Sequence, residues 1–242
     1  MKDHEDAFGH ALHDYYQGKK AQIIIERDDG NLDVSGEPAS YFRDFDEWDE
    51  YEQEAMNAVR GRILDLGSGA GRHSLYLQNR GHDVVALDNS PLAIEVVKRR
   101  GVRDTALMPV TQISSRLGTF ETIIMMGNNF GLLADKRRAR WLLRRFYKMT
   151  SPEARIVTTS LNPRLTDDPL HLACHERNRR RGRMIGQVRI RVRYRNLKGL
   201  WFDYLLVSKE EMEEISNSAG WMVSKIIESE GPMYAAIIEK AQ

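Results

Sequence analysis

The stretch R-I-L-D-L-G-S-G-A-G-R, residues 62–72, decides the fold, because an apolar run passes directly into a glycine-rich loop. A buried strand that turns sharply into a helix needs residues without a Cβ atom, and Gly67, Gly69 and Gly71 provide them. The same lack of side chains lets a ligand approach the backbone. The pattern therefore predicts a strand–loop–helix unit that cradles a nucleotide-like cofactor.

A second apolar run, D-V-V-A-L-D at residues 83–88, ends in an acid. It follows the glycine loop by about 20 residues, the spacing at which an acid accepts hydrogen bonds from a ribose diol. We therefore interpret Asp88 as the ribose ligand.

The glycine spacing argues against a dinucleotide site. The dinucleotide fingerprint is G-x-G-x-x-G, and its third glycine lets the helix pack closely on the strand. Here Gly71 comes one position early and Arg72 stands at the third-glycine position. A cation near the positive end of a helix dipole is disfavoured unless an anion compensates it. Arg72 is therefore expected either to bind a carboxylate of the cofactor or to point into solvent, and both interpretations stay open.

The motifs D-L-G-S-G-A-G-R-H (65–73) and V-V-A-L-D-N-S-P (84–91) resemble the first two motifs of the class I S-adenosylmethionine-dependent methyltransferases. The order of later elements from Arg62 onward is also similar to that family, whereas the first sixty residues are less diagnostic. The resemblance implies S-adenosylmethionine as the cofactor and S-adenosylhomocysteine as the product.

By this resemblance, the glycine loop holds the methionyl portion, Asp88 the ribose, the segment after the third predicted strand the adenine, and the segment after the fourth the region near the methyl group. The cofactor-binding candidates are Asp65, Gly67, Ser68, Gly69, Gly71, Arg72, Asp88, Asn89, Ser90, Met108, Pro109, Gly127, Asn128 and Asn129. For Asn128 and Asn129, a turn that satisfies its own backbone is the alternative. No catalytic residue is assigned, because in-line methyl transfer depends mainly on holding donor and acceptor aligned, and only some acceptors need a general base.

Strand and helix patterns alternate along the chain. Further strands are predicted at 104–108, 121–127 and 155–161, a helix at 135–149, and a final strand pair at 221–229 and 233–239. Ser90-Pro91 and the capping box of Ser208 and Glu211 mark helix starts. This alternation predicts an α/β fold, doubly wound, with a mainly parallel seven-stranded sheet and an antiparallel C-terminal strand.

We predict an N-terminal extension over 1–60 and a methyltransferase domain over 61–242, within which 162–206 is a substrate-side insertion. The extension should contain a hairpin at 21–34, outside the main sheet, and a helix at 46–60. In the family that the chain resembles, an N-terminal segment often closes over the cofactor, so the resemblance implies Tyr41, Phe42 and Trp48 as candidate lid aromatics; a packing role is the alternative.

The insertion contains R-I-R-V-R-Y-R at 189–195, which alternates cationic and apolar side chains as a strand does, and it should pair with 201–205 as a hairpin. Arg193, Tyr194 and Trp201, with Tyr41, are candidates to recognise an anionic or aromatic acceptor. The alternative, slightly favoured, is an edge strand whose arginines oppose aggregation.

Charge is distributed unevenly. Residues 1–60 hold 16 acidic and 6 basic side chains, whereas 177–198 hold nine Arg, one Lys and no acid. These segments are expected to attract each other. The net charge of +1 argues against a nucleic-acid acceptor, because a domain that binds nucleic acid is usually clearly basic. Methyltransferases that modify base amines have a proline pair after strand four, and this chain lacks that pair. Nucleic acid remains a minority alternative.

No run of 18 apolar residues and no signal pattern is present, so we expect no membrane partner and a cytoplasmic protein. The single Cys174 and scattered histidines predict neither a disulfide nor a metal site. The predicted function is methyl transfer from S-adenosylmethionine to a small-molecule acceptor. The alternatives are an RNA or protein methyltransferase, or a non-catalytic S-adenosylmethionine-binding module; the sequence does not indicate an oligomeric state.

Overall fold

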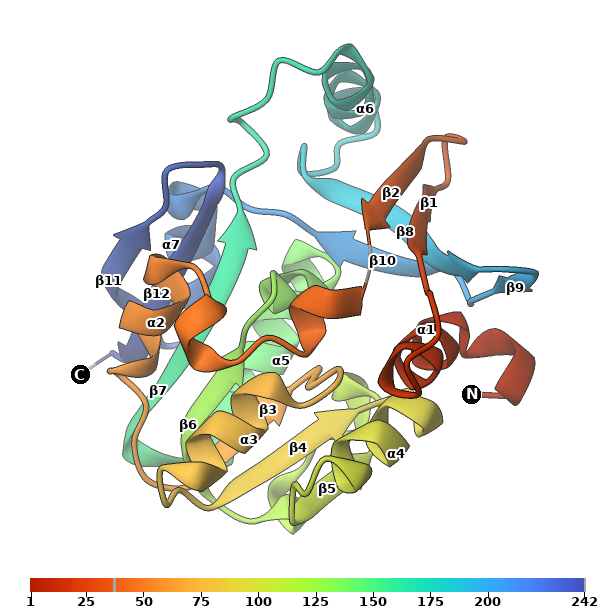
Figure 1. The fold of residues 1–242 in the computed structure, drawn as a ribbon. Helices are drawn as coiled ribbons and strands as arrows, with labels where there is room; N and C mark the ends of the chain where they lie inside the picture. The colour runs from red at the N-terminus through yellow and green to blue at the C-terminus, as the bar shows by residue number, and fades with distance from the viewer. Residues whose placement is uncertain (37, 242) are drawn as a thin grey trace. The chain divides into compact units, whose positions relative to one another are not determined.

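The structure, a computed structural model, describes residues 1–36 and 38–241 (Figure 1). The strands are β1 (Ile23–Arg27), β2 (Leu32–Gly36), β3 (Ile63–Leu66), β4 (Val84–Asp88), β5 (Asp104–Leu107), β6 (Phe120–Met125), β7 (Thr150–Leu161), β8 (Gln187–Tyr194), β9 (Leu197–Lys198), β10 (Phe202–Leu205), β11 (Trp221–Glu228) and β12 (Met233–Lys240). The α-helices are α1 (Ala7–Tyr16), α2 (Glu50–Met56), α3 (Arg72–Asn79), α4 (Pro91–Arg99), α5 (Lys136–Lys148), α6 (Pro169–Arg180) and α7 (Lys209–Asn217).

The strands form a seven-stranded sheet in the order β11-β12-β7-β6-β3-β4-β5 and a five-stranded sheet in the order β10-β8-β1-β2, with β9 paired to β8. In the larger sheet, β3–β4, β4–β5 and β6–β7 are parallel, while β12 is antiparallel to both of its neighbours. The predicted fold class, with an antiparallel C-terminal strand, is therefore confirmed.

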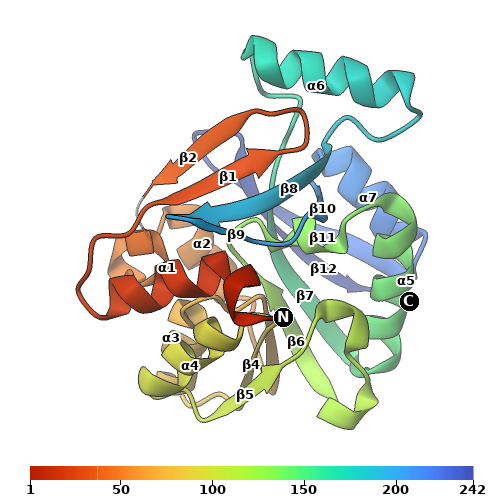
Figure 2. The ribbon, with the colours of Figure 1, turned by 90° about the vertical axis from the view of Figure 1, so that its right-hand side faces the viewer.

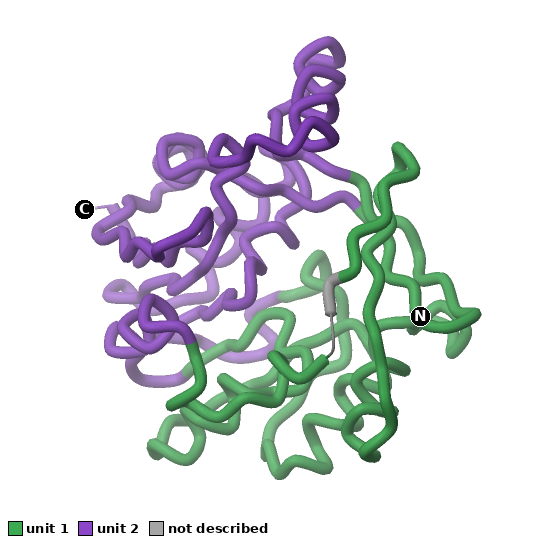
Figure 3. Tube along the Cα trace, turned by 45° about the horizontal axis from the view of Figure 1, so that its top comes forward, with its two compact units in different colours: residues 1–48, 63–113, 189–202 green, residues 49–62, 114–188, 203–242 purple. Residues whose placement is uncertain are grey.

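The chain divides into two compact units (Figure 3). Unit 1 comprises residues 1–48, 63–113 and 189–202, and unit 2 comprises residues 49–62, 114–188 and 203–242.

Unit 1 contains β3, β4 and β5, and every residue of β3 and β4 is buried. A continuous apolar run suits a strand covered on both faces, which explains why V-V-A-L in β4 does not alternate. The helix α4 begins as predicted, because the Ser90 hydroxyl accepts a hydrogen bond from the Ala93 amide at 3.0 Å and Pro91 stands at the first helical position.

The smaller sheet joins the N-terminal hairpin to the insertion. β1 pairs with β2, as predicted, and also antiparallel with β8, so that Glu26 lies opposite Arg191. Because β8 pairs with β1 along one side and with β9 along the other, it is not an edge strand. The interpretation of β8 as an edge strand whose arginines oppose aggregation was wrong; within the sheet, Arg191 lies opposite Glu26 and Arg193 lies opposite Ile24.

Unit 2 contains β6, β7, β12 and β11. The helix α7 has the predicted capping box, in which the Glu211 carboxylate accepts from the Ser208 amide at 2.9 Å. The predicted helix at 46–60 was too long. Residues 45–47 form a separate 3-10 turn and Trp48 has an extended backbone (φ −80°, ψ 154°), so α2 begins only after Asp49.

Candidate functional site

The glycine loop of unit 1 has the backbone that its sequence predicts. Gly67, Gly69 and Gly71 have φ values of 73°, 56° and 79°, in the left-handed region that disfavours residues with a Cβ atom. The amides of Gly67 and Ser68 donate to the Leu87 carbonyl at 2.8 and 3.0 Å, which ties the loop to the end of β4.

Close neighbours also demand glycine in this loop. A Cβ atom at Gly69 would lie 3.2 Å from the ring of Tyr41, and one at Gly71 would lie 3.2 Å from the Val97 side chain. The loop is therefore packed against one helix and covered by one aromatic ring.

Asp88, the last residue of β4, accepts hydrogen bonds from the glycine loop and from the start of α4. Its two carboxylate oxygens accept from the amides of Gly69 at 3.0 Å and Ser90 at 2.9 Å, and its exposed fraction is 7%. Burial raises the pKa of Asp88 to about 6, even though the backbone donors act in the opposite direction. Because a carboxylate offers about four acceptor positions, Asp88 retains capacity for a ligand hydroxyl.

Asp65 lies on β3, directly before the loop, and is also buried. Its carboxylate accepts a 2.5 Å hydrogen bond from the Ser74 hydroxyl on α3. Burial is the main cause that raises the pKa of Asp65 to about 7, and the charge of Asp88 adds to it. Ser74 was missed from the sequence; a serine on the face of α3 that returns to β3 was the available signal.

Arg72 lies over an aromatic ring rather than extending freely from the helix. Its guanidinium carbon is 5.1 Å from the centre of the Trp48 ring, which also contacts the His73 ring at 4.5 Å. Burial holds the pKa of His73 well below its usual value, so the imidazole is neutral. Its Nε2 has no hydrogen-bond partner among the described residues.

Two observations in unit 1 fit a bound nucleoside. The Ser68 hydroxyl is buried and lacks a hydrogen-bond partner in the described part of the chain. Leu107 is 53% exposed at the end of β5, directly opposite Asp88 in the strand register. An unsatisfied hydroxyl and an exposed apolar side chain beside an acceptor carboxylate match a ligand that carries both a sugar and a base.

The other candidates of unit 1 surround this loop. Tyr41 contacts Phe8 edge-on with ring centres 5.3 Å apart, and burial raises the pKa of its hydroxyl. The Met108 amide donates to the Asp88 carbonyl at 3.0 Å, so that Met108 and Pro109 follow directly after β5. Asn89 is exposed beside Asp88.

The turn after β6 belongs to unit 2, and its Asn128 is hydrogen-bonded to other groups of that unit. Asn128 has φ 67°; its amide donates to Thr159 Oγ1 at 2.7 Å, and its side-chain carbonyl accepts from the Leu161 amide at 2.9 Å. The Tyr204 hydroxyl donates to the Asn128 carbonyl at 2.5 Å. Gly127, also at φ 67°, and Asn129, the first residue of a 3-10 helix, flank it.

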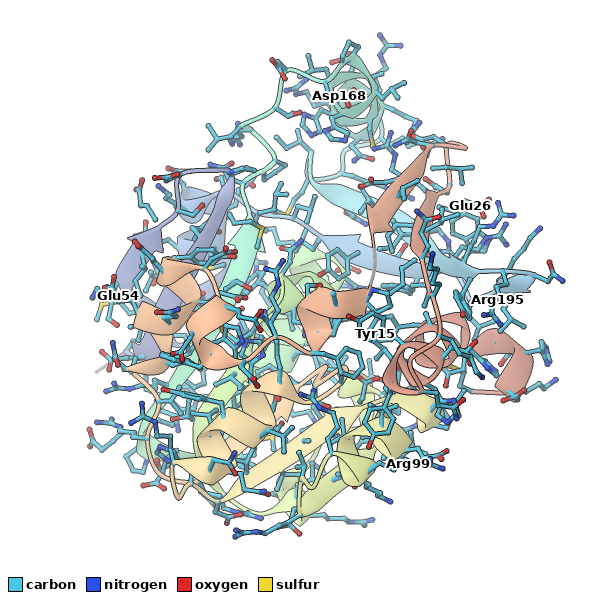
Figure 4. All side chains as sticks on the ribbon, in the orientation of Figure 1. Tyr15, Glu26, Glu54, Arg99, Asp168 and Arg195 are labelled. Carbon is cyan, nitrogen blue, oxygen red and sulfur yellow. The ribbon has the colours of Figure 1, made fainter. Side chains whose placement is uncertain are left out.

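The predicted substrate residues of the insertion contact other protein groups. Arg193 lies 3.5 Å from Glu26, and the Tyr194 hydroxyl donates to Asp14 at 2.8 Å while its ring is buried. Trp201 lies under the Arg191 guanidinium at 4.4 Å. Arg195 also pairs with Asp14, at 3.0 Å. The expected attraction between the acidic N-terminal segment and the basic strand is therefore confirmed; Glu26 and Arg195 are labelled in Figure 4.

A family model described as a methyltransferase domain matches residues 63–153. The glycine/sarcosine N-methyltransferase of Halorhodospira halochloris is 26% identical over 155 residues, covering 62% of this chain and 56% of that protein. That of Parasynechococcus marenigrum is 32% identical over 91 residues, covering 35% of this chain and 32% of that protein. The chain thus spans about half the length of the first of these curated relatives and a third of the second.

Among solved structures, a SAM-dependent methyltransferase from Bacteroides fragilis in complex with S-adenosyl-L-homocysteine has a TM-score of 0.85 and 25% identity, covering 100% of this chain and 98% of that one. A SAM-dependent methyltransferase from Methanosarcina mazei, at 16% identity and a TM-score of 0.62, shares the fold over 80% of this chain and 99% of that one. Within residues 1–36 and 38–241, no helix is both long and apolar enough to span a membrane.

Proposed function

We propose that this chain, which belongs to the class I S-adenosylmethionine-dependent methyltransferases, binds S-adenosylmethionine at the glycine loop of unit 1 and methylates a small-molecule amine. The observation that carries this proposal is Asp88, a buried carboxylate that accepts from the amides of Gly69 in the loop and Ser90 at the start of α4, in a site that also holds the unsatisfied Ser68 hydroxyl.

In this proposal, different residues of unit 1 bind different parts of the cofactor. Asp88 accepts hydrogen bonds from the ribose hydroxyls, and Leu107, Met108 and Pro109 provide the surface for the adenine. The glycine loop gives the methionyl portion close access to the backbone, and Arg72 pairs with its carboxylate. Asp65 joins β3 to α3, the two elements that flank the loop, through its hydrogen bond with Ser74.

Methyl transfer requires alignment more than proton chemistry. The sulfonium of the cofactor supplies an electrophilic methyl group, and the protein holds the acceptor nitrogen in line with it and excludes water. In this proposal Tyr41 covers the glycine loop from above. Gly127, Asn128 and Asn129 remain proposed contributors to the methyl region, and the small acceptor must present an unprotonated amine.

The acceptor class is supported by two arguments. The curated relatives named above are N-methyltransferases of glycine and sarcosine. In addition, Arg191 and Arg193 both contact Glu26, which reduces the cationic charge that this strand offers to a nucleic-acid backbone.

The cofactor proposal is tested by calorimetric titration with S-adenosylhomocysteine, S-adenosylmethionine and NAD. We expect binding of the first two and none of NAD. As a second readout, S-adenosylhomocysteine at 100 times its dissociation constant should stabilise the protein by about 2.7 kcal/mol. Binding of NAD alone would refute the cofactor assignment.

The acceptor proposal is tested with methyl-labelled S-adenosylmethionine and separate pools of small amines, RNA and protein, with glycine and sarcosine among the amines. We expect label to enter the small-amine pool with matching formation of S-adenosylhomocysteine. Label confined to RNA or protein would contradict the small-molecule acceptor while leaving the methyltransferase assignment intact.

A further inference from the structure

The N-terminal helix α1 is joined to the start of α4 by a buried carboxylate that no sequence motif indicates. Asp6, the residue before α1, is only 2% exposed. One of its carboxylate oxygens accepts from the Gly9 amide at 3.0 Å and thereby caps α1. The other accepts from the Ser90 hydroxyl at 2.9 Å and the Leu92 amide at 3.1 Å.

Ser90 connects this contact to the cofactor loop. Its hydroxyl donates to Asp6 and accepts from the Ala93 amide, while its own amide donates to Asp88 at 2.9 Å. Asp6 and Asp88 therefore hold opposite ends of the same residue. A displacement of α1 that releases Ser90 also releases one of the amides that orient the Asp88 carboxylate.

The packing between the helices leaves no room for a larger residue at Gly9. A Cβ atom there would lie 2.3 Å from the Ser90 hydroxyl and 2.4 Å from the Asp6 carboxylate. Glycine in a helix interior costs about 1 kcal/mol relative to alanine. Its presence in α1 is therefore explained by the close approach to α4, which Figures 1 and 2 show from two sides.

The same helix also covers the glycine loop through apolar contacts. Leu12 is fully buried in a cluster with Ala70 of the loop and with Ala93 and Val96 of α4. Phe8 packs on Tyr41, whose ring lies against Gly69. Docking of α1 thus affects the loop from two directions, through the polar path to Asp88 and through Tyr41.

We propose that Asp6 is a positioning residue that couples docking of the N-terminal helix α1 to binding of the cofactor by Asp88. This inference rests on the proposed function, because it assigns the ligand of Asp88 as S-adenosylmethionine. The inference goes beyond the proposed function because it makes α1, which is distant in sequence from Asp88, a determinant of cofactor affinity.

Two substitutions disrupt the contact by different means. Asp6→Asn keeps the shape of the side chain but removes the charge and one acceptor oxygen. We expect it to weaken binding of S-adenosylhomocysteine about tenfold, the scale of one charge-assisted hydrogen bond. Gly9→Ala keeps the carboxylate and favours an isolated helix, yet it should weaken binding as well, because the added methyl group separates α1 from Ser90.

Asp3→Asn is the matched control. Asp3 lies in the same N-terminal segment, its side chain is 82% exposed, and it contacts only His10 among the ion pairs of the described chain. We expect the Asp3→Asn variant and the wild-type protein to have the same dissociation constant for S-adenosylhomocysteine.

Hydrogen exchange supplies a readout that a purely structural role would not change. Coupling between two events is reciprocal. Saturating S-adenosylhomocysteine should therefore slow amide exchange in α1 of the wild-type protein, and the factor of slowing should fall in Asp6→Asn by as much as the affinity falls.

The outcomes separate the two proposals. If the wild-type protein fails to bind S-adenosylhomocysteine, the proposed function and this coupling both fail. If the wild type binds it but α1 exchanges at the same rate with and without ligand, the coupling is refuted and the proposed function stands. Wild-type affinity in Asp6→Asn would refute the role of Asp6 in the same way, and the measurement on the wild type does not depend on any variant folding.

Discussion

Two groups of carboxylates in unit 1 have opposite relations to their surroundings. Asp65 and Asp88 at the glycine loop are buried and have no ion-pair partner in the described part of the chain, and burial raises their pKa values to about 7 and about 6. In the five-stranded sheet, Glu26 accepts two hydrogen bonds from Arg191, at 2.8 and 2.9 Å, which lower its pKa.

The difference separates a binding site from a structural contact. A carboxylate with a raised pKa makes the free protein less stable when it is ionised, and such a cost is characteristic of functional sites. A carboxylate with a lowered pKa stabilises the folded chain. We infer that the loop acids serve a ligand, whereas Glu26 of β1 holds the Arg-rich strand β8.

The largest expected effect is on cofactor binding by Asp88→Ala. Hydrogen bonds to a charged group contribute about 1.5–3 kcal/mol each, so loss of the ribose acceptor should weaken S-adenosylhomocysteine binding about 100-fold. Calorimetric titration measures this loss. Asp104→Ala, an exposed acid at the start of β5, should retain the wild-type affinity; equal affinity in Asp88→Ala would remove Asp88 from the site.

The next effect is the pH dependence of binding. The ionised Asp88 carboxylate accepts with both oxygens from the amides of Gly69 and Ser90 and, in the proposed complex, from the ribose, whereas the protonated group accepts more weakly; its pKa is about 6. Affinity should therefore be constant above pH 7 and fall by about tenfold for each pH unit below 6. Titrations from pH 5 to pH 8 measure this dependence, and an affinity unchanged at pH 5 would contradict the assigned role.

The stability of the free protein should change with pH in the opposite direction to the affinity over the same range. Between about pH 4 and pH 7 the folded state binds more protons at Asp65 and Asp88 than the unfolded state does, so these two groups make stability rise as pH falls. Glu26, whose pKa is lowered in the folded state, stabilises the protein at every pH above the pKa it has in the unfolded chain. This stabilisation is lost only as the pH falls below about 4.5. Melting temperatures between pH 7.5 and pH 5.5 test this sign.

The smallest effect is expected for Glu26→Gln. Loss of the partner of Arg191 should lower the melting temperature by about 2–4 °C, as for one partly solvated ion pair in a chain of this size. The dissociation constant of S-adenosylhomocysteine should change by less than about twofold, because the effect is structural. Asp33→Asn on β2, an exposed residue of the same sheet, is the control. A large loss of affinity in Glu26→Gln would abolish the distinction between the two groups.

Much of the fold was predictable because its signals are local. The V-V-A-L run, the Ser90-Pro91 start of α4 and the Ser208–Glu211 capping box each specify an element within a few residues. The pairing of β1 with β8 was not predicted as such, since it joins residues about 165 positions apart and only the charge asymmetry indicated an attraction. The same non-local pairing made the edge-strand interpretation wrong.

The candidate site was predictable to a similar degree. Glycine positions and a distant acid identify a loop and its acceptor, because a positive φ angle and a buried strand end restrict residue choice. Asp6 carries no such signal, and Ser74 carries only its place on the face of α3 toward β3. Each acts through a tertiary hydrogen bond, Asp6 to Ser90 and Ser74 to Asp65. Asn128 illustrates the converse, because this polar residue at the end of a parallel strand is bonded to other protein groups: its amide and side chain to β7, and its carbonyl to Tyr204 of β10.

The central claim is that the glycine loop and Asp88 hold the adenosyl part of S-adenosylmethionine. A crystal structure of the protein with S-adenosylhomocysteine tests it most directly. We predict ribose hydroxyls within hydrogen-bonding distance of the Asp88 carboxylate, and the methionyl portion beside Gly67–Gly71. A ligand bound elsewhere, or an Asp88 carboxylate that contacts only protein groups in that complex, would contradict the account.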